Sequence, residues 1–115
     1  MMGRRFLTAA AVTMLTVLTV MNPAAQTAPD KVHGQAVYHY WCSPCHAPGP
    51  GHPGTQSLAI KYARTAIPAV LEQRRDLTPA FVKTMVRQGI LLMAPFRKTE
   101  ISDADLADLA AYLSK

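Results

Sequence analysis

The stretch Trp41-Cys42-Ser43-Pro44-Cys45-His46 is the densest group of reactive side chains in this chain of 115 residues. It holds both cysteines of the sequence, with a histidine directly after the second. On a helix the two thiols would lie one turn apart, on the same face. Two cysteines are too few for a disulfide-rich scaffold or a four-cysteine zinc site. Whatever these six residues do, they do it as one local cluster.

The order Cys-x-x-Cys-His is the sequence to which a c-type haem is attached covalently. Cys42 and Cys45 would form thioethers with the two vinyl groups of the haem. The imidazole of His46 would then lie beneath the iron as its proximal ligand. Because five residues can match by chance, the flanking sequence has to decide whether the motif is used.

Upstream of the motif the sequence predicts a helix over residues 31–41. Asp30 stands where a helix N-cap is expected, because its carboxylate can accept from the first free backbone N–H groups. Gly34, Val37 and Tyr38 then fall on one face of that helix. The helix would lead directly into the motif.

Downstream, a helix is predicted to start after Thr78-Pro79 and to end near Gly89. Helical spacing places Met85 among its core residues. Met93 follows in a loop stiffened by Pro95, and a loop can project a thioether sulfur across a flat haem. We therefore expect Met93 to be the sixth iron ligand, with Met85 as the alternative.

The remaining histidines are weaker candidates for the iron. His33 and His39 fall on the first predicted helix, where exposure is the simpler reading. His52 follows His46 by six residues, so the chain could reach the opposite haem face only if it were nearly extended. Residues 47–54 hold three prolines and three glycines, which predicts a loop.

The rest of the chain reads as supporting helices. Segments 57–64 and 68–75 are helix candidates. Ser102 and Asp105 form a capping box, with Ile101 and Leu106 placed as a hydrophobic staple. The apolar stripe of this last helix is predicted to be Leu106, Leu109, Ala110 and Leu113.

Taken together, these features resemble the class I (mono-haem) cytochrome c family. Members carry a glycine and an aromatic residue shortly before the haem motif, here Gly34 and Tyr38. They also carry a methionine loop after a helix that ends in glycine, and a last helix with an ending like residues 109–113. The resemblance covers residues 30–115. One departure is Ala94, which separates Met93 from the proline that follows it directly in many members.

The resemblance implies an all-α fold in which the first and last helices cross and loops wrap around one covalently bound haem c. Gly34 would let those helices approach closely, with Tyr112 near the crossing. His46 and Met93 would be the axial iron ligands. A proline carbonyl, from Pro50 or Pro53, would accept the Nδ1–H of the proximal histidine.

The implied function is that of a single-electron carrier without substrate chemistry of its own, or of such a subunit in an oxidoreductase complex. Residues 58–101 look closest to cytochromes that serve flavin-dependent dehydrogenases, including the cytochrome subunit of p-cresol methylhydroxylase. The expected partners are therefore a donor dehydrogenase, a flavoprotein among the options, and an acceptor oxidase or another cytochrome. A free carrier between a respiratory complex and a terminal oxidase is the alternative within the family.

The N-terminus predicts a secretory signal peptide over residues 1–25, with cleavage somewhere in 24–28, and a cytochrome c domain over 26–115. Arg4 and Arg5 precede an uncharged apolar run over 6–21, which is short of the roughly 20 residues that a membrane span needs. Cleavage would place the domain in the periplasm without a membrane span. It would also lower the basic residues from 12 to 10 against seven acidic ones, so the net charge would fall from +5 to +3.

Basic residues gather in the middle of the chain and acidic ones near its end. Arg87, Arg97 and Lys98 flank the methionine loop, where a basic ring would steer an acidic redox partner. Nucleic acid is the less favoured partner, because a signal peptide would remove the chain from the cytoplasm.

A second class of function fits the motif itself. Trp41-Cys42-x-Pro44-Cys45 also resembles the thioredoxin motif, which would make the chain a periplasmic thiol–disulfide oxidoreductase. That fold needs an apolar strand before the motif and a helix that begins at the first cysteine. The helical segment upstream and the Pro/Gly loop downstream favour the haem protein.

Overall fold

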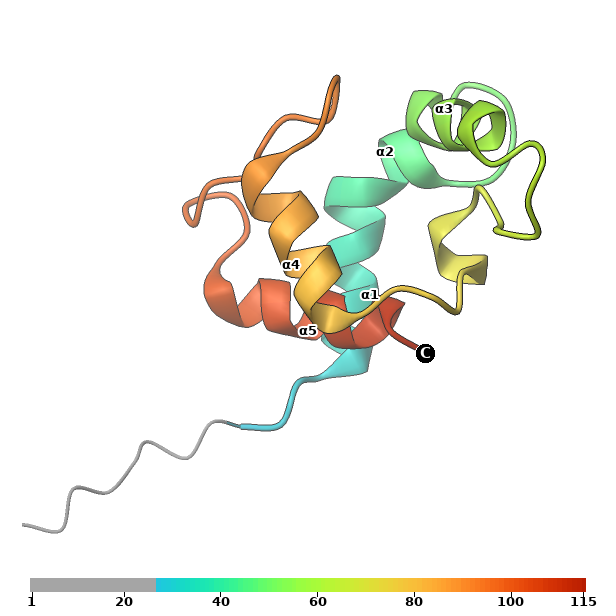
Figure 1. The fold of residues 1–115 in the computed structure, drawn as a ribbon. Coiled ribbons are helices and arrows are strands. Elements are labelled where there is room, and N and C mark those ends of the chain that lie inside the picture. Colours follow the sequence, from blue (N-terminus) through green and yellow to red (C-terminus); the bar gives the residue numbers. More distant parts are fainter. Residues whose placement is uncertain (1–26) are drawn as a thin grey trace, which may run out of the picture.

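The structure, a computed structural model, describes residues 27–115. The predicted signal peptide over residues 1–25 lies outside this range. The described chain is helical and contains no strand, so the all-α expectation is confirmed (Figure 1). Its elements are, in order, α1 (Lys31–Val37), a π-helix (Tyr38–Cys42), α2 (Ser43–His46), α3 (Pro53–Lys61), a 3-10 turn (Leu71–Gln73), α4 (Pro79–Gln88) and α5 (Asp103–Leu113).

The first helix begins where its cap predicts. The Asp30 carboxylate accepts from the backbone N–H of Val32 at 2.8 Å and of His33 at 3.2 Å. The predicted helix over 31–41 is helical throughout, but α1 ends at Val37 and the last turn is a π-helix through Cys42. π-Helical turns are rare in proteins, and those that do occur are frequently found at functional sites. Here the turn carries the chain from α1 into the cysteine motif.

Helices α1 and α5 cross in close contact, as the resemblance implied (Figure 1). A Cβ at Gly34 would lie 2.1 Å from the backbone oxygen of Asp108, which no side chain could tolerate. Tyr38 is fully buried next to this crossing, and its ring centroid lies 5.8 Å from that of Tyr112. The glycine therefore allows the two backbones to touch.

The apolar core lies between α1, α4 and α5. It consists of ten buried residues, namely Val37, Tyr38, Leu77, Val82, Val86, Ile101, Leu106, Leu109, Ala110 and Leu113. All four residues of the predicted stripe on the last helix belong to it. In contrast, no apolar residue between positions 39 and 76 is buried. The cysteine motif and α3 thus lie outside the protein's own core.

The middle segment differs from the sequence expectation. Helix α3 covers residues 53–61, whereas the sequence predicts a helix over 57–64. The helix begins earlier because Pro53 can occupy the first turn of a helix. The predicted loop over 47–54 therefore ends two residues early. The candidate helix over 68–75 is only a 3-10 turn. Its neighbour Arg74 has an extended backbone, is buried and donates through its guanidinium to the nearby Asp76.

Both C-terminal helices start with the caps that the sequence indicates. The Thr78 hydroxyl accepts from the backbone N–H of Phe81 at 3.1 Å, and α4 ends at Gly89, whose φ of 66° suits glycine. The capping box of Ser102 and Asp105 is formed at the start of α5. The predicted loop between the two helices is thereby fixed at both ends.

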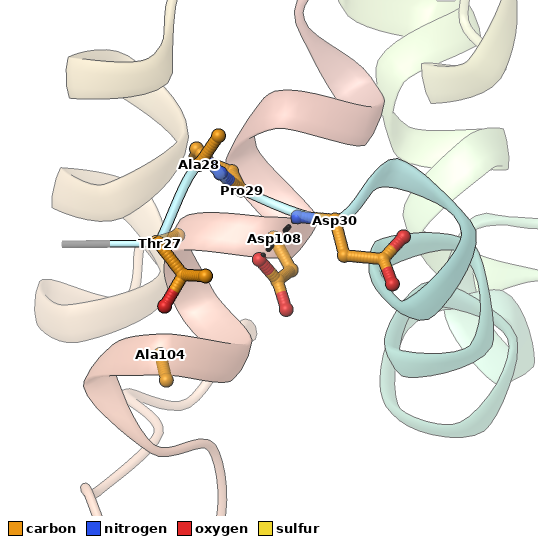
Figure 2. A pocket seen from close by; sticks show the side chains of 7 residues that line it. Thr27, Ala28, Pro29, Asp30, Ala104 and Asp108 are labelled. Carbon is orange, nitrogen blue, oxygen red and sulfur yellow. Dashed lines mark hydrogen bonds between the residues drawn. The ribbon is translucent and has the colours of Figure 1, made fainter. Parts of the chain in front are cut away.

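The chain enters the domain beside α5, and Figure 2 shows the close contact there: the backbone N–H of Asp30 donates to Asp108 Oδ1 at 2.8 Å. A shallow hollow beside this contact is lined by Thr27, Ala28, Pro29, Asp30, Ala104, Ala107 and Asp108. It lies at the end of α1 opposite the cysteine motif (Figure 1). Among the described residues, no helix has the length and apolar character needed to cross a membrane.

Candidate functional site

The cysteine motif spans the junction between the π-helix and α2. Cys42 is the last residue of the π-helix, is half-buried and packs against the apolar core. Cys45 lies in α2 and is exposed, and His46 ends that helix partly buried. Both thiols are free. The motif therefore has one sulfur near the core and one toward solvent.

The Cys42 thiol lacks the thiolate character that disulfide exchange needs. Burial raises the pKa of Cys42 to about 12, and the neighbouring Cys45 adds to the effect. Thioredoxin-type cysteines act as thiolates, with a pKa lowered by their surroundings. In addition, a helix precedes the motif, and residues 27–115 contain no strand. The thioredoxin-like alternative therefore finds no support.

His46 is fixed through both its backbone and its ring. The buried Tyr38 hydroxyl donates to the His46 carbonyl at 3.0 Å. A Cβ at Gly54 would lie 2.6 Å from Cε1 of the imidazole, so the ring rests against that glycine. Burial lowers the pKa of His46 below its ordinary value of 6.5, which keeps the imidazole neutral near pH 7. A neutral imidazole is the form that ligates metals.

The predicted orientation of His46 by a proline is not found. Its Nδ1 is buried and has no hydrogen-bond partner within the part of the chain that the structure describes. Neither the Pro50 nor the Pro53 carbonyl accepts from it. The reason is that α3 begins at Pro53, which turns that segment into a helix and brings Gly54 against the ring instead.

The start of α3 is joined to the motif by two side chains, that of its N-cap residue His52 and that of Thr55 in its first turn. His52 Nδ1 donates to the Pro44 carbonyl at 3.1 Å, and the Thr55 hydroxyl donates to the Ala47 carbonyl at 3.0 Å. Thr55 is buried. His52 is thus engaged with the backbone of the motif itself. No functional role was predicted for Gly54 or Thr55, and their only signal in the sequence is that they follow Pro53.

Met93 lies in a short closed turn after α4. Its N–H donates to the Ile90 carbonyl and its carbonyl accepts from the Ile90 N–H, both at 2.9 Å. A Cβ at Gly89 would lie 2.4 Å from the Met93 oxygen, so the turn folds tightly back on the helix end. Leu91 and Leu92 form its exposed tip. Met93 itself is partly buried and packs against the core.

An aromatic contact joins the motif to the methionine loop. The rings of Trp41 and Phe96 meet edge to face with centroids 5.8 Å apart. The Phe96 backbone is held in turn, because its N–H donates to the Val86 carbonyl at 2.8 Å. The cysteine motif and the methionine loop, which are about fifty residues apart in sequence, thus meet on one side of the core. A haem held by His46 from the motif and Met93 from the loop would require these two segments to be close.

Met85 was expected to be a core residue, and this expectation is wrong. It is only partly buried and belongs neither to the core nor to the side chains packed against it. It shares a face of α4 with Phe81, four residues earlier, which is also exposed to solvent. Core burial therefore does not exclude Met85, and the choice of Met93 rests on loop geometry and packing.

The residues around the motif fit a large apolar cofactor. The segment from 39 to 76 has no buried apolar side chain of its own, while Trp41, Cys42, Met93 and Phe96 are left half-buried at its edge. No three His, Cys, Asp or Glu side chains within residues 27–115 gather as a metal site. One histidine and one thioether are the donors that a haem needs, because the porphyrin nitrogens supply the other positions.

The predicted basic ring around the methionine loop is largely neutralised. Arg87 pairs with Asp103 at 2.9 Å, and Lys98 contacts the same carboxylate at 2.6 Å. Arg97 lies 3.5 Å from Glu100. The fold places the acidic start of α5 directly beside these cations, although the sequence separates them by up to 16 residues. Three positive side chains paired with two carboxylates leave a net charge of about +1 here, which is a weak positive patch and not a basic ring.

The fold and the motif define a small all-α haem protein with one Cys-x-x-Cys-His site. A family model described as cytochrome c oxidase, cbb3-type, subunit III, matches residues 29–113, nearly all of the described chain. The chain belongs to this cytochrome c family, and it binds haem c covalently as an electron-transfer protein. The match gives no support to the narrower likeness to cytochromes of flavin-dependent dehydrogenases. No curated protein and no solved structure matched the chain.

Proposed function

We propose that this chain is a periplasmic single-electron carrier whose haem c is attached through Cys42 and Cys45 and ligated by His46 and Met93. One observation carries the proposal: Cys42 and Met93, which come from segments far apart in sequence, both pack against the same apolar core. The edge-to-face contact of Trp41 with Phe96 brings the two segments together. Met85 remains the alternative for the sixth ligand.

When bound, the haem iron supplies a one-electron ferric/ferrous couple, and the protein's part is to hold the ligands still. The Tyr38 hydroxyl fixes the backbone of His46, and burial keeps the imidazole neutral. The paired hydrogen bonds between Ile90 and Met93 fix the backbone that would carry the thioether. A neutral, soft thioether favours the reduced iron, which raises the reduction potential.

Secretion agrees with the family, because cytochrome c domains typically work in the periplasm or outside the cell. We assign residues 1–25 to a signal peptide, with cleavage in 24–28, and residues 26–115 to the mature cytochrome domain. The cationic start and the uncharged apolar run over 6–21 support this assignment. The mature chain would then carry a net charge of +3 before the haem propionates are counted.

The partners follow from the one-electron chemistry. We propose a dehydrogenase as the donor, with a flavoprotein as the class suggested by the likeness of residues 58–101, and the respiratory chain as the acceptor. The family description names an oxidase, which supports the acceptor side. An oxidase or another cytochrome would take the electron.

The test begins with a reduced-minus-oxidised absorption spectrum of the protein purified from the periplasm. A mono-haem c protein gives sharp bands on reduction that survive acid–acetone extraction. Replacing Cys42 and Cys45 together by alanine should abolish covalent attachment, so that the colour is extracted. If haem stays on the double variant after extraction, the attachment sites are wrong. A colourless wild-type protein would contradict the whole proposal.

A further inference from the structure

The first turn of α3 lies directly against the cysteine motif. Three contacts join the start of α3 to α2 and the residue after it. The N-cap residue His52 donates to the Pro44 carbonyl, Gly54 faces the His46 ring, and Thr55 donates to the Ala47 carbonyl. These contacts all lie on one side of His46. The start of α3, from His52 to Thr55, thus forms a surface against which the imidazole ring packs, and this surface is called the platform below.

Gly54 makes the tightest of these contacts. A Cβ added there would lie 2.6 Å from Cε1 of His46, 2.8 Å from Nδ1 and 2.8 Å from the Cys45 carbonyl oxygen. Gly49 and Gly51 in the preceding loop differ, because a Cβ at either position meets nothing within 4 Å. Those two glycines have positive φ, of 95° and 87°, and so serve the backbone. Gly54 alone of the three serves the approach of the imidazole.

The helical position of Gly54 sharpens this contrast. It lies in the first turn of α3 and has no positive φ, so any residue could adopt its backbone conformation. Alanine forms helices better than glycine does. A glycine at such a position is explained by what lies where a Cβ would point, which is the ring of His46 and, beside it, the carbonyl oxygen of Cys45.

We propose that Gly54 is a positioning residue that sets where the imidazole of His46 lies, and that the Thr55 hydrogen bond holds Gly54 in place. This inference rests on the proposed role of His46 as the proximal ligand. A methyl group at position 54 would push the ring away from α3 and change its tilt and distance relative to the iron. Losing the Thr55 hydroxyl would let the same platform move.

The test uses the haem-loaded protein and reads the ligand field of the ferric iron by electron paramagnetic resonance, together with the reduction potential. Gly54→Ala should shift the low-spin g values and the potential while covalent haem content stays normal. Gln56→Ala, an exposed change two positions on in α3, is the matched control and should leave both unchanged. Wild-type g values and potential in Gly54→Ala would overturn the inference.

A second pair of variants covers the case in which Gly54→Ala does not fold. Thr55→Val keeps the side-chain shape but removes the donor to Ala47, so it should shift the g values. Thr55→Ser keeps the hydroxyl and should restore them. Unchanged g values in Thr55→Val would overturn the role of the platform. A wild-type protein without the low-spin signal of a histidine-ligated haem would instead contradict the proposed function itself.

Discussion

His46 and Met93 are held by different means, and this difference decides how each would respond to change. His46 is fixed by a buried hydroxyl on its carbonyl and by a backbone surface against its ring. Met93 has a fixed backbone, but its side chain is held only by packing against the core. An unbranched thioether with several rotatable bonds adapts to its partner. We therefore expect the histidine to set the geometry and the methionine to follow.

Replacing Met93 by alanine should remove the weak near-infrared charge-transfer band of a methionine-ligated ferric haem. The potential should fall as well, since the soft ligand that favours reduced iron is lost. Near-infrared absorption of the oxidised protein is the measurement, with Met85→Ala as the control, because that residue lies on α4 outside the core. If the band persists in Met93→Ala and vanishes in Met85→Ala, Met85 is the ligand.

At the scale of elements, the crossing of α1 and α5 is the contact on which the fold depends. Gly34 allows the two backbones to touch, and Tyr38 and Tyr112 pack beside them. Asp108 on α5 then accepts twice from the start of α1, from the Asp30 N–H at 2.8 Å and from His33 Nδ1 at 2.8 Å. Steric fit and hydrogen bonding thus specify the same crossing.

Gly34→Ala should destabilise the protein although alanine is the better helix former. The added Cβ would lie 2.1 Å from a backbone oxygen of α5, and backbone cannot rotate away as a side chain can. We expect a loss of about 1–3 kcal/mol in the free energy of unfolding, which is the usual range for overpacking. Urea denaturation of the haem-loaded protein measures it. Equal or greater stability than wild type would show that the helices separate freely.

The contact of His33 with Asp108 should make stability depend on pH. The hydrogen bond to Asp108 raises the pKa of His33 above 6.5, so this stabilisation is complete below pH 6.5 and is lost as pH rises through the raised value. The same bond lowers the pKa of Asp108 below 3.8, so its contribution is present above pH 3.8 and is lost as pH falls through the lowered value. The pair therefore contributes most between these limits.

This pH dependence is tested by comparing wild type with His33→Gln in urea denaturation at pH 5 and at pH 8. Wild type should be the more stable at pH 5, and the gap should shrink at pH 8. Asp105, whose Oδ1 lies 3.7 Å from Nε2 of His33, adds to the attraction while the imidazole is protonated, and so at pH 5 more than at pH 8. A gap of the same size at pH 5 and pH 8 would mean that protonation of His33 does not hold the helices.

The sequence predicted those parts of the elements that depend on neighbours in the chain. Asp30, Thr78 and the capping box of Ser102 with Asp105 were readable because each cap bonds within three residues. The start of α3 was not predicted, because the three prolines and three glycines over residues 47–54 indicate a loop, although proline also suits the first turn of a helix. The pairing of Arg87 with Asp103 could not be read at all, since it depends on how two helices pack.

For the molecule as a whole, the uneven core is the central fact. Every buried apolar residue comes from positions 37–38 or 77–113, so α1, α4 and α5 form the only core of the described chain. The half that carries the motif and α3 has no buried apolar side chain of its own. Trp41, Cys42 and Leu71 pack against the edge of the core, and hydrogen bonds such as that of Thr55 with Ala47 join α3 to the motif. A chain this short buries little surface and often needs a cofactor to complete its core. A covalently bound haem would supply the missing apolar contacts for that half.

This division predicts unequal protection from hydrogen exchange once the haem is absent. In the double variant Cys42→Ala/Cys45→Ala, backbone amides of α1 and α5 should stay protected, because neither cysteine is among the ten buried core residues and Cys42 only packs against the edge of that core. Amides of α3 should exchange near the unprotected rate, although they are protected in the haem-loaded protein. Exchange measured by mass spectrometry on both forms gives the comparison. If α3 is equally protected in the two forms, this half of the protein folds without the cofactor. If protection is lost throughout, the core of α1, α4 and α5 does not stay folded without the haem.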